Sequence, residues 1–384
     1  MIEWTLVTGA TGFIGGEWVL RALARGEYVA AFVRAGREPH LLTHLDQLAR
    51  QHAQATPSFD RLVVVPWLAG SEFSSFQLLR QSGVEKISSV IHAAADMAYA
   101  LGKLPRSLET NLTLGVGLYD ALTRYAPECR HFTAISTAYT CGLAPSAEIA
   151  EELHYRPKLV NGYQISKWSS ELALTLRAQQ GGPRLCILRP SIVVGEGARG
   201  VYTGKCFGFY MFLRAFALAK KAGAKRMQVP ISPAAEVNLV PIDQLLCLLD
   251  ELRRGEQGGV VHGALREGVS VAYMMEKIGE LYGFPISFGK PKTFAEHLFT
   301  QQVRANMAFA NTTFRFATAT AEALLPKRNW QSLGEESFVR IVKFSKSLYL
   351  QKLHFDRADL SILPQLLPLK NISRLTRVMR EKLP

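Results

Sequence analysis

A glycine-rich turn close to the start of the chain limits its fold more than any other segment. Residues 8–15 read Thr-Gly-Ala-Thr-Gly-Phe-Ile-Gly and stand between an apolar run at 4–8 and a helical pattern. Glycines in this spacing permit a tight turn, close approach of a pyrophosphate to the backbone, and close packing of helix on strand. The order strand, glycine turn, helix therefore predicts a dinucleotide-binding unit. The turn residues expected to contact the cofactor are Gly9, Thr11, Gly12, Phe13, Ile14 and Gly15.

The first half of the chain alternates short apolar, β-branched runs with longer helical patterns, as a parallel sheet with crossover helices requires. We predict an α/β fold of the Rossmann type, in which a doubly wound parallel sheet is joined to a smaller, mostly helical substrate lobe. The expected strands are Trp4–Thr8, Tyr28–Val33, Leu62–Pro66, Ser89–His92, His131–Ser136, Arg184–Arg189 and Gly259–Gly263. The expected helices begin at Gly12, span Leu104–Tyr125 and span Gly162–Gln179.

Two later stretches lack this rhythm, and they set the expected domain boundaries. Residues 1–195 and 237–265 should form the NADP-binding Rossmann domain, and residues 196–236 and 266–384 the substrate lobe with a C-terminal helical extension. The apolar segment 207–218 fits a core helix or the wall of a groove for a hydrophobic substrate. The tail at 363–379 mixes leucines with arginines, which fits a packed terminal helix, a docking helix or a peripheral membrane contact.

Composition excludes several classes of protein. The 384 residues are 48% hydrophobic, which is enough for a sizeable core. No uninterrupted apolar stretch reaches the ~18 residues of a membrane-spanning helix, and the first residues lack a signal-peptide pattern. The five cysteines are widely spaced and include no C-x-x-C, so we expect reduced thiols, no metal site and a cytoplasmic location.

The net charge of +13 is concentrated after residue 200, because residues 1–200 hold 19 basic and 17 acidic side chains. Such a basic region is either a solvated face or a surface that attracts an acidic carrier protein, a phosphorylated substrate or an anionic membrane. No zinc-finger, RRM or basic-zipper pattern is present in the sequence, so a nucleic-acid partner is not expected.

The end of the second expected strand indicates which nicotinamide cofactor fits. An acidic residue there would bind the ribose 2′-hydroxyl of NAD, whereas an arginine suits the 2′-phosphate of NADP. This strand ends in Phe-Val-Arg at 32–34, a second arginine follows at position 37, and no acidic residue comes before Glu38. We therefore expect NADPH, held in part by Arg34 and Arg37.

Three residues form a candidate proton-transfer site. Tyr163 and Lys167 are four residues apart, which places them on one face of a helix. The ammonium should lower the pKa of the phenol and hold the cofactor ribose. Thr137 follows the fifth strand, where its hydroxyl can hydrogen-bond the substrate oxygen. Tyr273 and Lys277 have the same spacing but no such hydroxyl-bearing strand end before them, so we assign them to an ordinary helix.

Together these features resemble an extended short-chain dehydrogenase/reductase over about residues 2–265. Within that superfamily the chain looks most like fatty acyl-CoA reductases, with their male-sterility-type NAD-binding domain, and thioester-reductase domains of carboxylic acid reductases and nonribosomal synthetases. The matching segments are FVRA at 32–35, HAAA at 92–95, TNL at 110–112, STAY at 136–139 and LRPSIVVG at 188–195.

This resemblance implies specific roles for residues outside the glycine turn. The catalytic residues would be Thr137, Tyr163 and Lys167, beside a neighbouring hydroxyl at Ser136. Asn111 would mark the helix that supports the site, or serve only as a structural amide. The remaining cofactor contacts would be Ala93 and Ala94 at the adenosine and ribose, and Pro190, Ile192 and Val193 over the nicotinamide. The family usually has an aspartate after the third strand to bind adenine, and segment 66–70 has none.

Three functions remain open from the sequence. The resemblance implies an NADPH-dependent oxidoreductase that reduces an acyl thioester, carried by CoA or by a separate acyl or peptidyl carrier protein, to an aldehyde or on to an alcohol. The alternative is an NADPH-dependent ketoreductase or alcohol dehydrogenase acting on a free hydrophobic carbonyl compound that is sterol- or flavonoid-like. The third is a non-catalytic NADP-binding regulator. The oligomeric state cannot be predicted from these features.

Overall fold

A computed structural model describes residues 2–143, 148–326 and 330–352, which divide into two compact units. The first unit holds the described residues up to Lys205 together with Asn238–Gly268 and Phe314–Gly334. The second holds Cys206–Val237, Val269–Thr313 and the described residues from Glu335 onward. The basic pair at 327–328 that adds to the charge of the second half lies in part of the chain that is not described, as does the leucine- and arginine-containing tail at 363–379.

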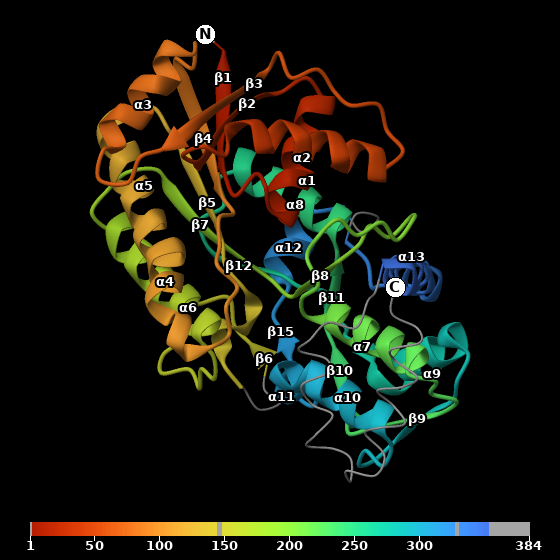
Figure 1. The fold of residues 1–384 in the computed structure, drawn as a ribbon. Helices are drawn as coiled ribbons and strands as arrows, with labels where there is room; N and C mark the ends of the chain where they lie inside the picture. Colours follow the sequence, from red (N-terminus) through yellow and green to blue (C-terminus); the bar gives the residue numbers. More distant parts are fainter. Residues whose placement is uncertain (1, 144–147, 327–329, 353–384) are drawn as a thin grey trace. The chain divides into compact units, whose positions relative to one another are not determined.

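The first unit is built on a parallel sheet of seven strands in the order β12-β7-β5-β4-β1-β2-β3 (Figure 1). Every expected strand is confirmed within one to three residues at each end, because each is an apolar run that a buried parallel strand requires. The observed strands are β1 (Glu3–Thr8), β2 (Tyr28–Arg34), β3 (Leu62–Trp67), β4 (Lys86–His92), β5 (His131–Ile135), β7 (Arg184–Pro190) and β12 (Gly259–Gly263).

Helices cover both faces of this sheet and make it doubly wound (Figure 1). One face carries α1 (Phe13–Ala24), α2 (Glu38–Gln51) and α8 (Ile242–Arg254). The other carries α3 (Glu72–Gln81), α5 (Leu114–Tyr125) and α6 (Gly162–Ala178). Successive residues of β1 point to opposite faces, so Leu6 and Val7 belong to two separate hydrophobic clusters, and both are fully buried.

Shorter elements of the first unit connect these layers. The helix expected at 104–125 is interrupted by a π-helical turn at 109–113, which separates α4 from α5. The short elements are η1 (Leu101–Lys103), α4 (Leu104–Leu108), η2 (Glu109–Thr113), η3 (Ala138–Cys141), β6 (Glu148–Ile149), β8 (Ile192–Val194), β11 (Leu239–Pro241), β15 (Arg315–Phe316) and α12 (Ala319–Leu324).

The structure assigns residues 196–205 and 314–334 to the first unit, where the sequence placed them in the lobe. The later segment returns to the sheet unit because β15 pairs with β6 and α12 packs against β12. Trp330, 8% exposed, then packs into the hydrophobic cluster beneath α8. The segments in contact are separated by tens of residues, and β15 and β6 by more than a hundred, so no local pattern predicts these contacts.

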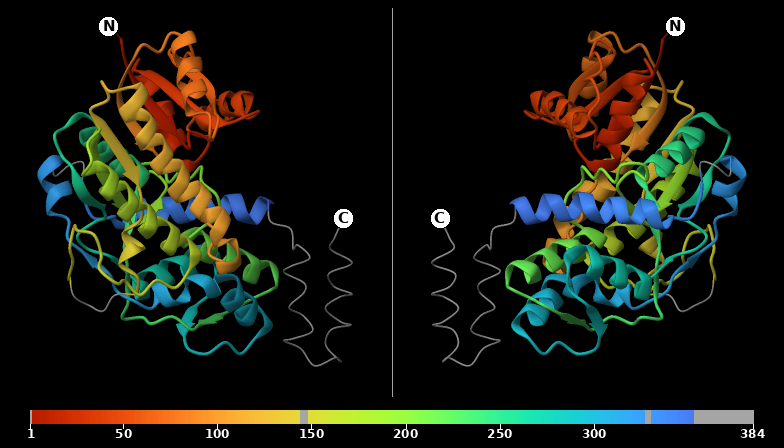
Figure 2. Two further views of the ribbon diagram at one scale, coloured as in Figure 1. Left: turned by 90° about the vertical axis from the view of Figure 1, so that its left-hand side faces the viewer. Right: turned by 90° about the vertical axis from the view of Figure 1, so that its right-hand side faces the viewer.

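The second unit is mostly helical. Its helix α7 is buried on nearly every side, as the expectation of a core helix requires, and the ring of Phe216 lies 4.5 Å from that of Phe299. Figure 2 shows α13 along its length, and this helix packs against α7 and α9. The elements are α7 (Phe209–Lys221), β9 (Met227–Val229), β10 (Glu236–Val237), β13 (Val269–Ser270), α9 (Val271–Tyr282), β14 (Ile286–Phe288), α10 (Phe294–Val303), η4 (Arg304–Asn306), α11 (Met307–Ala310) and α13 (Glu335–Lys352).

The edge strands of the large sheet, β12 and β3, each have one backbone position that cannot donate to a further strand. On β12 the backbone N–H of His262 donates to the carboxylate of Glu151 over 2.7 Å, and the hydroxyl of Thr320 donates to the other oxygen of that carboxylate. On β3 the residue aligned with Val33 is Pro66, which has no backbone N–H.

Among the described residues no helix is both long enough and apolar enough to cross a membrane. Within the same ranges no group of histidine, cysteine, aspartate and glutamate side chains is arranged to hold a metal ion. All five cysteines lie in the described part and are free thiols.

A buried charged cluster joins α1, α2 and the segment after β8. His52, at the end of α2, contacts the carboxylate of Glu17 on α1 at 2.9 Å and that of Glu196 at 3.6 Å. Arg199 pairs with Glu196 and donates to the backbone carbonyl of His52. Hydrogen bonds that the His52 imidazole donates to the two carboxylates, to that of Glu17 foremost, raise the pKa of His52 to about 9.

This cluster predicts a loss of stability at alkaline pH. Because the pKa of His52 is raised on folding, its contribution is complete below the unfolded value of about 6.5 and is lost as the pH rises through 9. In urea titrations, His52→Gln should be less stable than the wild type at pH 7 by roughly 1–2 kcal/mol, a figure reduced by solvent screening. The difference should shrink at pH 9.5. His40→Gln, at an exposed position of α2, is the control. If the free energy of unfolding fell with pH at the same rate in all three proteins, the role assigned to His52 would be contradicted.

Candidate active site

The glycine turn has no room for side chains. Gly9 has φ +72°, and a Cβ there would lie 2.5 Å from the backbone carbon of Ala93. A Cβ on Gly15 would collide with the carbonyl of Gly9. Gly12 is the N-cap of α1 and has no side-chain cap. The first backbone N–H groups of the helix are therefore available to bind an anion. This cradle fits the pyrophosphate of a dinucleotide.

The other turn residues surround the cradle without closing it. Thr11 is exposed, Phe13 and Ile14 are half-buried, and the ring of Phe13 packs on that of Tyr202 at 4.7 Å. Their side chains are therefore available beside the cradle. Contact of Thr11, Phe13 and Ile14 with a cofactor stays a prediction.

The loop after β4 is fixed against the glycine turn. The backbone N–H of Ala93 donates to the carbonyl of Thr8 at 3.1 Å, and that of Ala94 reaches the Thr8 hydroxyl at 3.4 Å. That hydroxyl also bonds Nδ1 of His92 at 2.8 Å. Burial lowers the pKa of His92 to about 3, so its imidazole is neutral. Ala93 and Ala94 thus border the cradle, and His92 is held at the strand end through Nδ1, while its buried Nε2 has no hydrogen-bond partner among the described residues.

Two arginines lie at the end of β2. Arg34 is the last residue of β2 and Arg37 caps α2, with the turn between them closed by a 3.0 Å backbone hydrogen bond. Both side chains are exposed. Within the described residues neither guanidinium is paired with a carboxylate, so both remain available to a phosphate.

The structure brings the three candidate catalytic residues together. Helix α6 begins where the side chain of Asn161 accepts the N–H of Gln164 at 2.8 Å, so Tyr163 lies in the first turn. The phenol of Tyr163 lies near enough to the Thr137 hydroxyl for that hydroxyl to favour the phenolate. The Nζ of Lys167, only 4% exposed, donates to the carbonyl of Ile135 at the end of β5 over 2.7 Å.

The expected direction of the phenol pKa is wrong. Burial raises the pKa of Tyr163 far above its ordinary value, and the hydrogen bond from Thr137 offsets this only in part. The same burial lowers the pKa of Lys167 to about 8, with Glu171 opposing the shift. The Tyr–Lys spacing says nothing about burial, which dominates here. Tyr163 is therefore a neutral phenol, a proton donor and not a base.

Two neighbouring polar residues serve as supports. The Ser136 hydroxyl donates to the buried carboxylate of Glu171, so it is not free to bind a substrate. The amide of Asn111, in the π-helical turn, bonds both the N–H and the carbonyl of Asp96 and donates to the Ser166 hydroxyl at 2.8 Å. Asn111 is thus a structural amide that ties the loop after β4 to α6.

The cofactor contacts expected over the nicotinamide lie at the carboxyl end of β7 and just after it, at Pro190, Ile192 and Val193. Pro190 is the last residue of that strand, and β8 then pairs in parallel with β11. Ile192 and Val193 are half-buried. Parallel strands end at one edge, so these residues lie at the same edge as the glycine turn and Thr137.

Sequence reasoning missed aromatic rings that pack near Tyr163 and near Tyr139. The ring of Tyr99 lies 6.3 Å from that of Tyr163. Tyr139, two residues after Thr137, packs edge-on against Phe314 at 5.1 Å and against Phe316 at 6.0 Å. Tyr139 stands in the STAY segment, but Phe314 and Phe316 carry no local signal because they reach the site only through the pairing of β15 with β6.

The second Tyr–Lys pair differs in its surroundings. Tyr273 and Lys277 lie on α9 in the second unit, and Lys277 pairs with the carboxylates of Glu280 and Glu335. The buried hydroxyl of Tyr273 has no hydrogen-bond partner among the described residues. The ordinary helical role expected for this pair agrees with these contacts.

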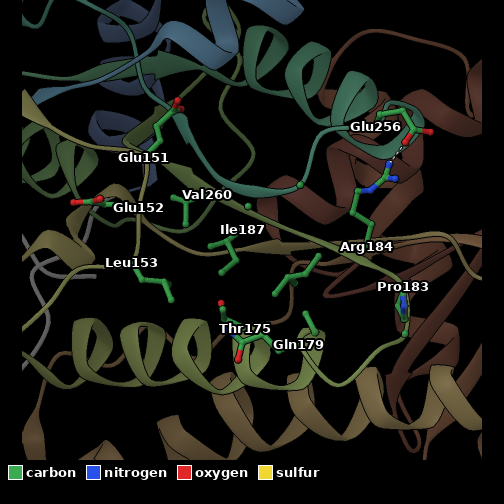
Figure 3. A pocket seen from close by; sticks show the side chains of 15 residues that line it. Glu151, Glu152, Leu153, Thr175, Gln179, Pro183, Arg184, Ile187, Glu256 and Val260 are labelled. Atoms are coloured by element: carbon green, nitrogen blue, oxygen red, sulfur yellow. Dashed lines mark ion pairs between the residues drawn. The ribbon is translucent and has the colours of Figure 1, made fainter.

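A cavity of about 640 Å³ lies elsewhere in the first unit, along the first halves of β7 and β12 (Figure 3). Thr175 and Gln179 of α6 line one side, and Arg184 forms an ion pair there with Glu256. None of the candidate site residues lines it. The cavity is therefore separate from the chemistry at the carboxyl ends of the strands.

Residues 7–248 match the model of the NAD-binding family described as male sterility protein. A dTDP-4-dehydro-6-deoxy-D-allose reductase from Streptomyces sp is 30% identical over 198 residues, which are 50% of this chain and 56% of that protein. The hybrid PKS-NRPS synthetase mycA of Thermothelomyces thermophilus is 29% identical over 214 residues, 50% of this chain and 5% of that protein. The chain thus spans about half the length of the first of these relatives and a small part of the second.

Solved structures share the fold. The terminal R domain from the myxalamid PKS-NRPS pathway has a TM-score of 0.72 at 20% identity, with 92% of each chain covered. A thiolation-reductase di-domain from an archaeal non-ribosomal peptide synthetase has a TM-score of 0.66 at 17% identity, covering 91% of this chain and 76% of that one. UDP-glucuronic acid 4-epimerase from Bacillus cereus has a TM-score of 0.63 at 16% identity, covering 90% and 100%.

The glycine turn gives a test with a matched control. Gly9 and Gly70 have nearly the same φ, +72° and +77°, but a Cβ on Gly70 meets nothing within 4 Å. Alanine at either position should cost roughly 1–2 kcal/mol of backbone strain. Gly9→Ala should also push the glycine turn from the loop after β4 and weaken NADPH binding at least tenfold in fluorescence titrations. Equal affinities of the two variants would contradict the assigned cradle.

Proposed function

The chain belongs to the NAD-binding family described as male sterility protein, and we propose that it is a nicotinamide-dependent oxidoreductase that reduces a carbonyl group. The observation that carries this proposal is that Thr137 lies near the phenol of Tyr163, which stands one helical turn before the buried amine of Lys167. These groups stand at the edge of the sheet where the glycine cradle also lies. A hydride acceptor held there would have its oxygen within reach of two hydroxyl groups.

The proton transfer follows from the state of the side chains. The bound cofactor would supply the hydride. The neutral phenol of Tyr163 donates its proton to the carbonyl oxygen as negative charge develops there, and the Thr137 hydroxyl donates a hydrogen bond to the same oxygen. Protonated Lys167 then stabilises the phenolate that remains. Burial keeps the phenol of Tyr163 neutral but also makes it a weaker acid, so the nearby ammonium of Lys167 is needed to stabilise the phenolate as the proton leaves.

We propose an acyl thioester as the substrate and an aldehyde as the first product. Hydride addition to the thioester carbonyl gives a hemithioacetal, which releases a thiol to leave the aldehyde; a second hydride would give an alcohol. The sequence resemblance to thioester reductases supports this choice, as do the related R domains. The ring of Tyr99 next to Tyr163, and the packed rings of Tyr139 and Phe314 after the Thr137 turn, are suited to an apolar acyl group.

We propose that the thioester is presented by CoA or by a carrier protein on another chain. In the described part of the second unit, exposed cations lie at the end of α7, directly after α7 and after β14. They are Lys220, Lys221, Lys225, Arg226, Lys290 and Lys292. Such a surface would favour binding of an acidic partner. A basic surface attracts an acidic domain or a phosphate group in an ionic-strength-dependent way.

Reduction of a free hydrophobic carbonyl is the second candidate. A Synechocystis relative named as a putative dihydroflavonol 4-reductase is 29% identical over 205 residues, and the same three residues would serve that reaction. A non-catalytic regulator that binds NADP is the third candidate. It would not need the two hydroxyl groups of Thr137 and Tyr163 near a buried lysine.

The substrate and the catalytic tyrosine can be tested together. NADPH oxidation is followed with a medium-chain acyl-CoA and with the same acyl group on a carrier protein, while any aldehyde is trapped. Tyr163→Phe should lower kcat by roughly 100-fold or more, because the proton donor is lost. Tyr273→Phe is the control with the same substitution and spacing, and it should leave kcat unchanged.

Three results would argue against these assignments. Equal losses in both tyrosine variants would remove the catalytic role of Tyr163. NADPH binding with turnover of free ketones or aldehydes, and none of either thioester, would favour the second candidate. Binding without any turnover would favour the regulator.

We propose NADPH over NADH on the basis of the unpaired arginines at β2. Arg34→Asp should lower the ratio of kcat/KM for NADPH to that for NADH by roughly 10- to 100-fold, since a hydrogen bond between charged groups contributes about 1.5–3 kcal/mol. Arg124→Asp, an exposed arginine of α5, should leave the ratio unchanged. A wild-type preference for NADH would show that the arginines do not select the cofactor.

A further inference from the structure

We propose that the buried ion pair of Glu171 and Arg189 is a positioning pair for the reduction: it fixes the Thr137 hydroxyl beside Tyr163 and supplies the negative charge that keeps Lys167 in its ammonium form. The inference rests on the proposed function, because it assigns a role toward the reacting groups. Neither residue is itself a donor or acceptor to the substrate in this proposal.

The pair is completely removed from solvent and well formed. Glu171 is 2% exposed and Arg189 is 0% exposed. The guanidinium binds both carboxylate oxygens, Nη2 to Oε2 at 2.6 Å and Nε to Oε1 at 3.0 Å. The remaining Nη1 contacts the carbonyl of Glu152 at 2.8 Å and Nε2 of His154 at 2.9 Å. Arg189 thereby connects β7, α6 and the segment at 152–154.

The carboxylate of Glu171 also fixes the backbone on both sides of Thr137. The hydroxyl of Ser136, directly before Thr137, donates to Oε1 of Glu171. The hydroxyl of Thr140, three residues after it, reaches the same oxygen at 3.3 Å and bonds the carbonyl of Thr137 at 3.0 Å. One buried oxygen thus fixes the turn that presents the Thr137 hydroxyl.

Glu171 continues the face of α6 that carries the reacting groups. Tyr163, Lys167 and Glu171 follow one another at intervals of four residues, so they lie along one side of the helix. Burial lowers the pKa of Lys167, and among the neighbouring groups Glu171 raises it. The carboxylate therefore opposes the loss of the ammonium charge that burial would cause.

Several titratable groups on neighbouring elements lie around the face of α6 that carries Lys167 and Glu171. His92 of β4 and Lys167 repel each other when both are charged, and the low pKa of His92 keeps it neutral. His154 is also neutral, because burial and Arg189 lower its pKa to about 3. Burial raises the pKa of the Cys141 thiol to about 12. Glu171 is then the anion facing Lys167, and Arg189 is the cation that balances it.

The unfavourable desolvation of such a pair favours a role beyond stability. Taking two charges out of water is unfavourable, and well-packed apolar residues at such positions are often at least as stabilising. The pair stands one helical turn beyond Lys167 and beside the Thr137 turn, where its charge and hydrogen bonds act on both.

The first variant is Glu171→Gln, which keeps the shape and removes the charge. The alkaline limb of the kcat profile should move to lower pH by about one unit, as expected for the loss of a nearby opposite charge. At pH 8 kcat should then fall about tenfold relative to its value at pH 6, with a smaller change in KM. An unshifted profile would overturn the role assigned to Glu171.

Two further variants separate charge, geometry and stability. Glu171→Asp keeps the charge but withdraws it from the Ser136 and Thr140 hydroxyls, so kcat should fall at all pH values while the profile stays in place. Asp250→Asn removes an equally buried carboxylate of α8 that pairs with Arg25 at 2.8 Å on the other face of the sheet. It should lower the unfolding temperature without moving the profile. A shift of the profile in Asp250→Asn would mean that the effect reports stability alone.

A direct measurement keeps this inference separate from the proposed function. The Lys167 amine is titrated by NMR in protein with ¹³C-labelled lysine, with Lys167→Met to assign its resonance. Glu171→Gln should lower the pKa of this amine even if no substrate is ever turned over. Inactivity of the wild type on every carbonyl compound tried would contradict the proposed function only, whereas an unchanged Lys167 titration would contradict the positioning role.

Discussion

Parallel pairing of the seven strands is the constraint on which the rest of this structure depends. Because the strands run in one direction, the turns after β1, β4, β5 and β7 all lie at one edge of the sheet, although they are separated by tens of residues in the chain. The pairing of Thr8 with His92, and of His92 with Ala134, sets the glycine turn beside the two loops that carry the other candidate residues. No single segment could assemble such a site.

Burial, and not spacing, gives the candidate residues their chemistry. Tyr163 and Tyr273 each precede a lysine by four residues, yet Lys277 pairs with surface carboxylates and Lys167 is enclosed. Enclosure keeps the phenol protonated and brings the amine close to its titration point. A proton relay can use both states, because the phenol carries the proton and the nearby ammonium stabilises the phenolate that remains.

The strands and the Tyr163–Lys167 pair were predictable because their signals are local. Buried parallel strands are apolar runs, and a helix face repeats every four residues. The return of residues 314–334 to the first unit was not predictable, because it depends on a two-residue pairing between β15 and β6. The direction of the phenol pKa depends on burial, which no spacing encodes. Glu171 and Arg189 did leave a signal: an acidic residue one turn after Lys167, and an arginine inside an apolar strand.

The two edge strands of the large sheet affect how copies of this chain can associate. A sheet normally ends in open backbone groups on which another strand can form. Here the His262 amide on β12 is already bonded to the Glu151 carboxylate, and β3 contains a proline that cannot donate. A strand from a neighbouring molecule would have to displace a charged group on one side and would miss a donor on the other. Crowded molecules of this protein therefore have little means of joining their sheets into a continuous aggregate.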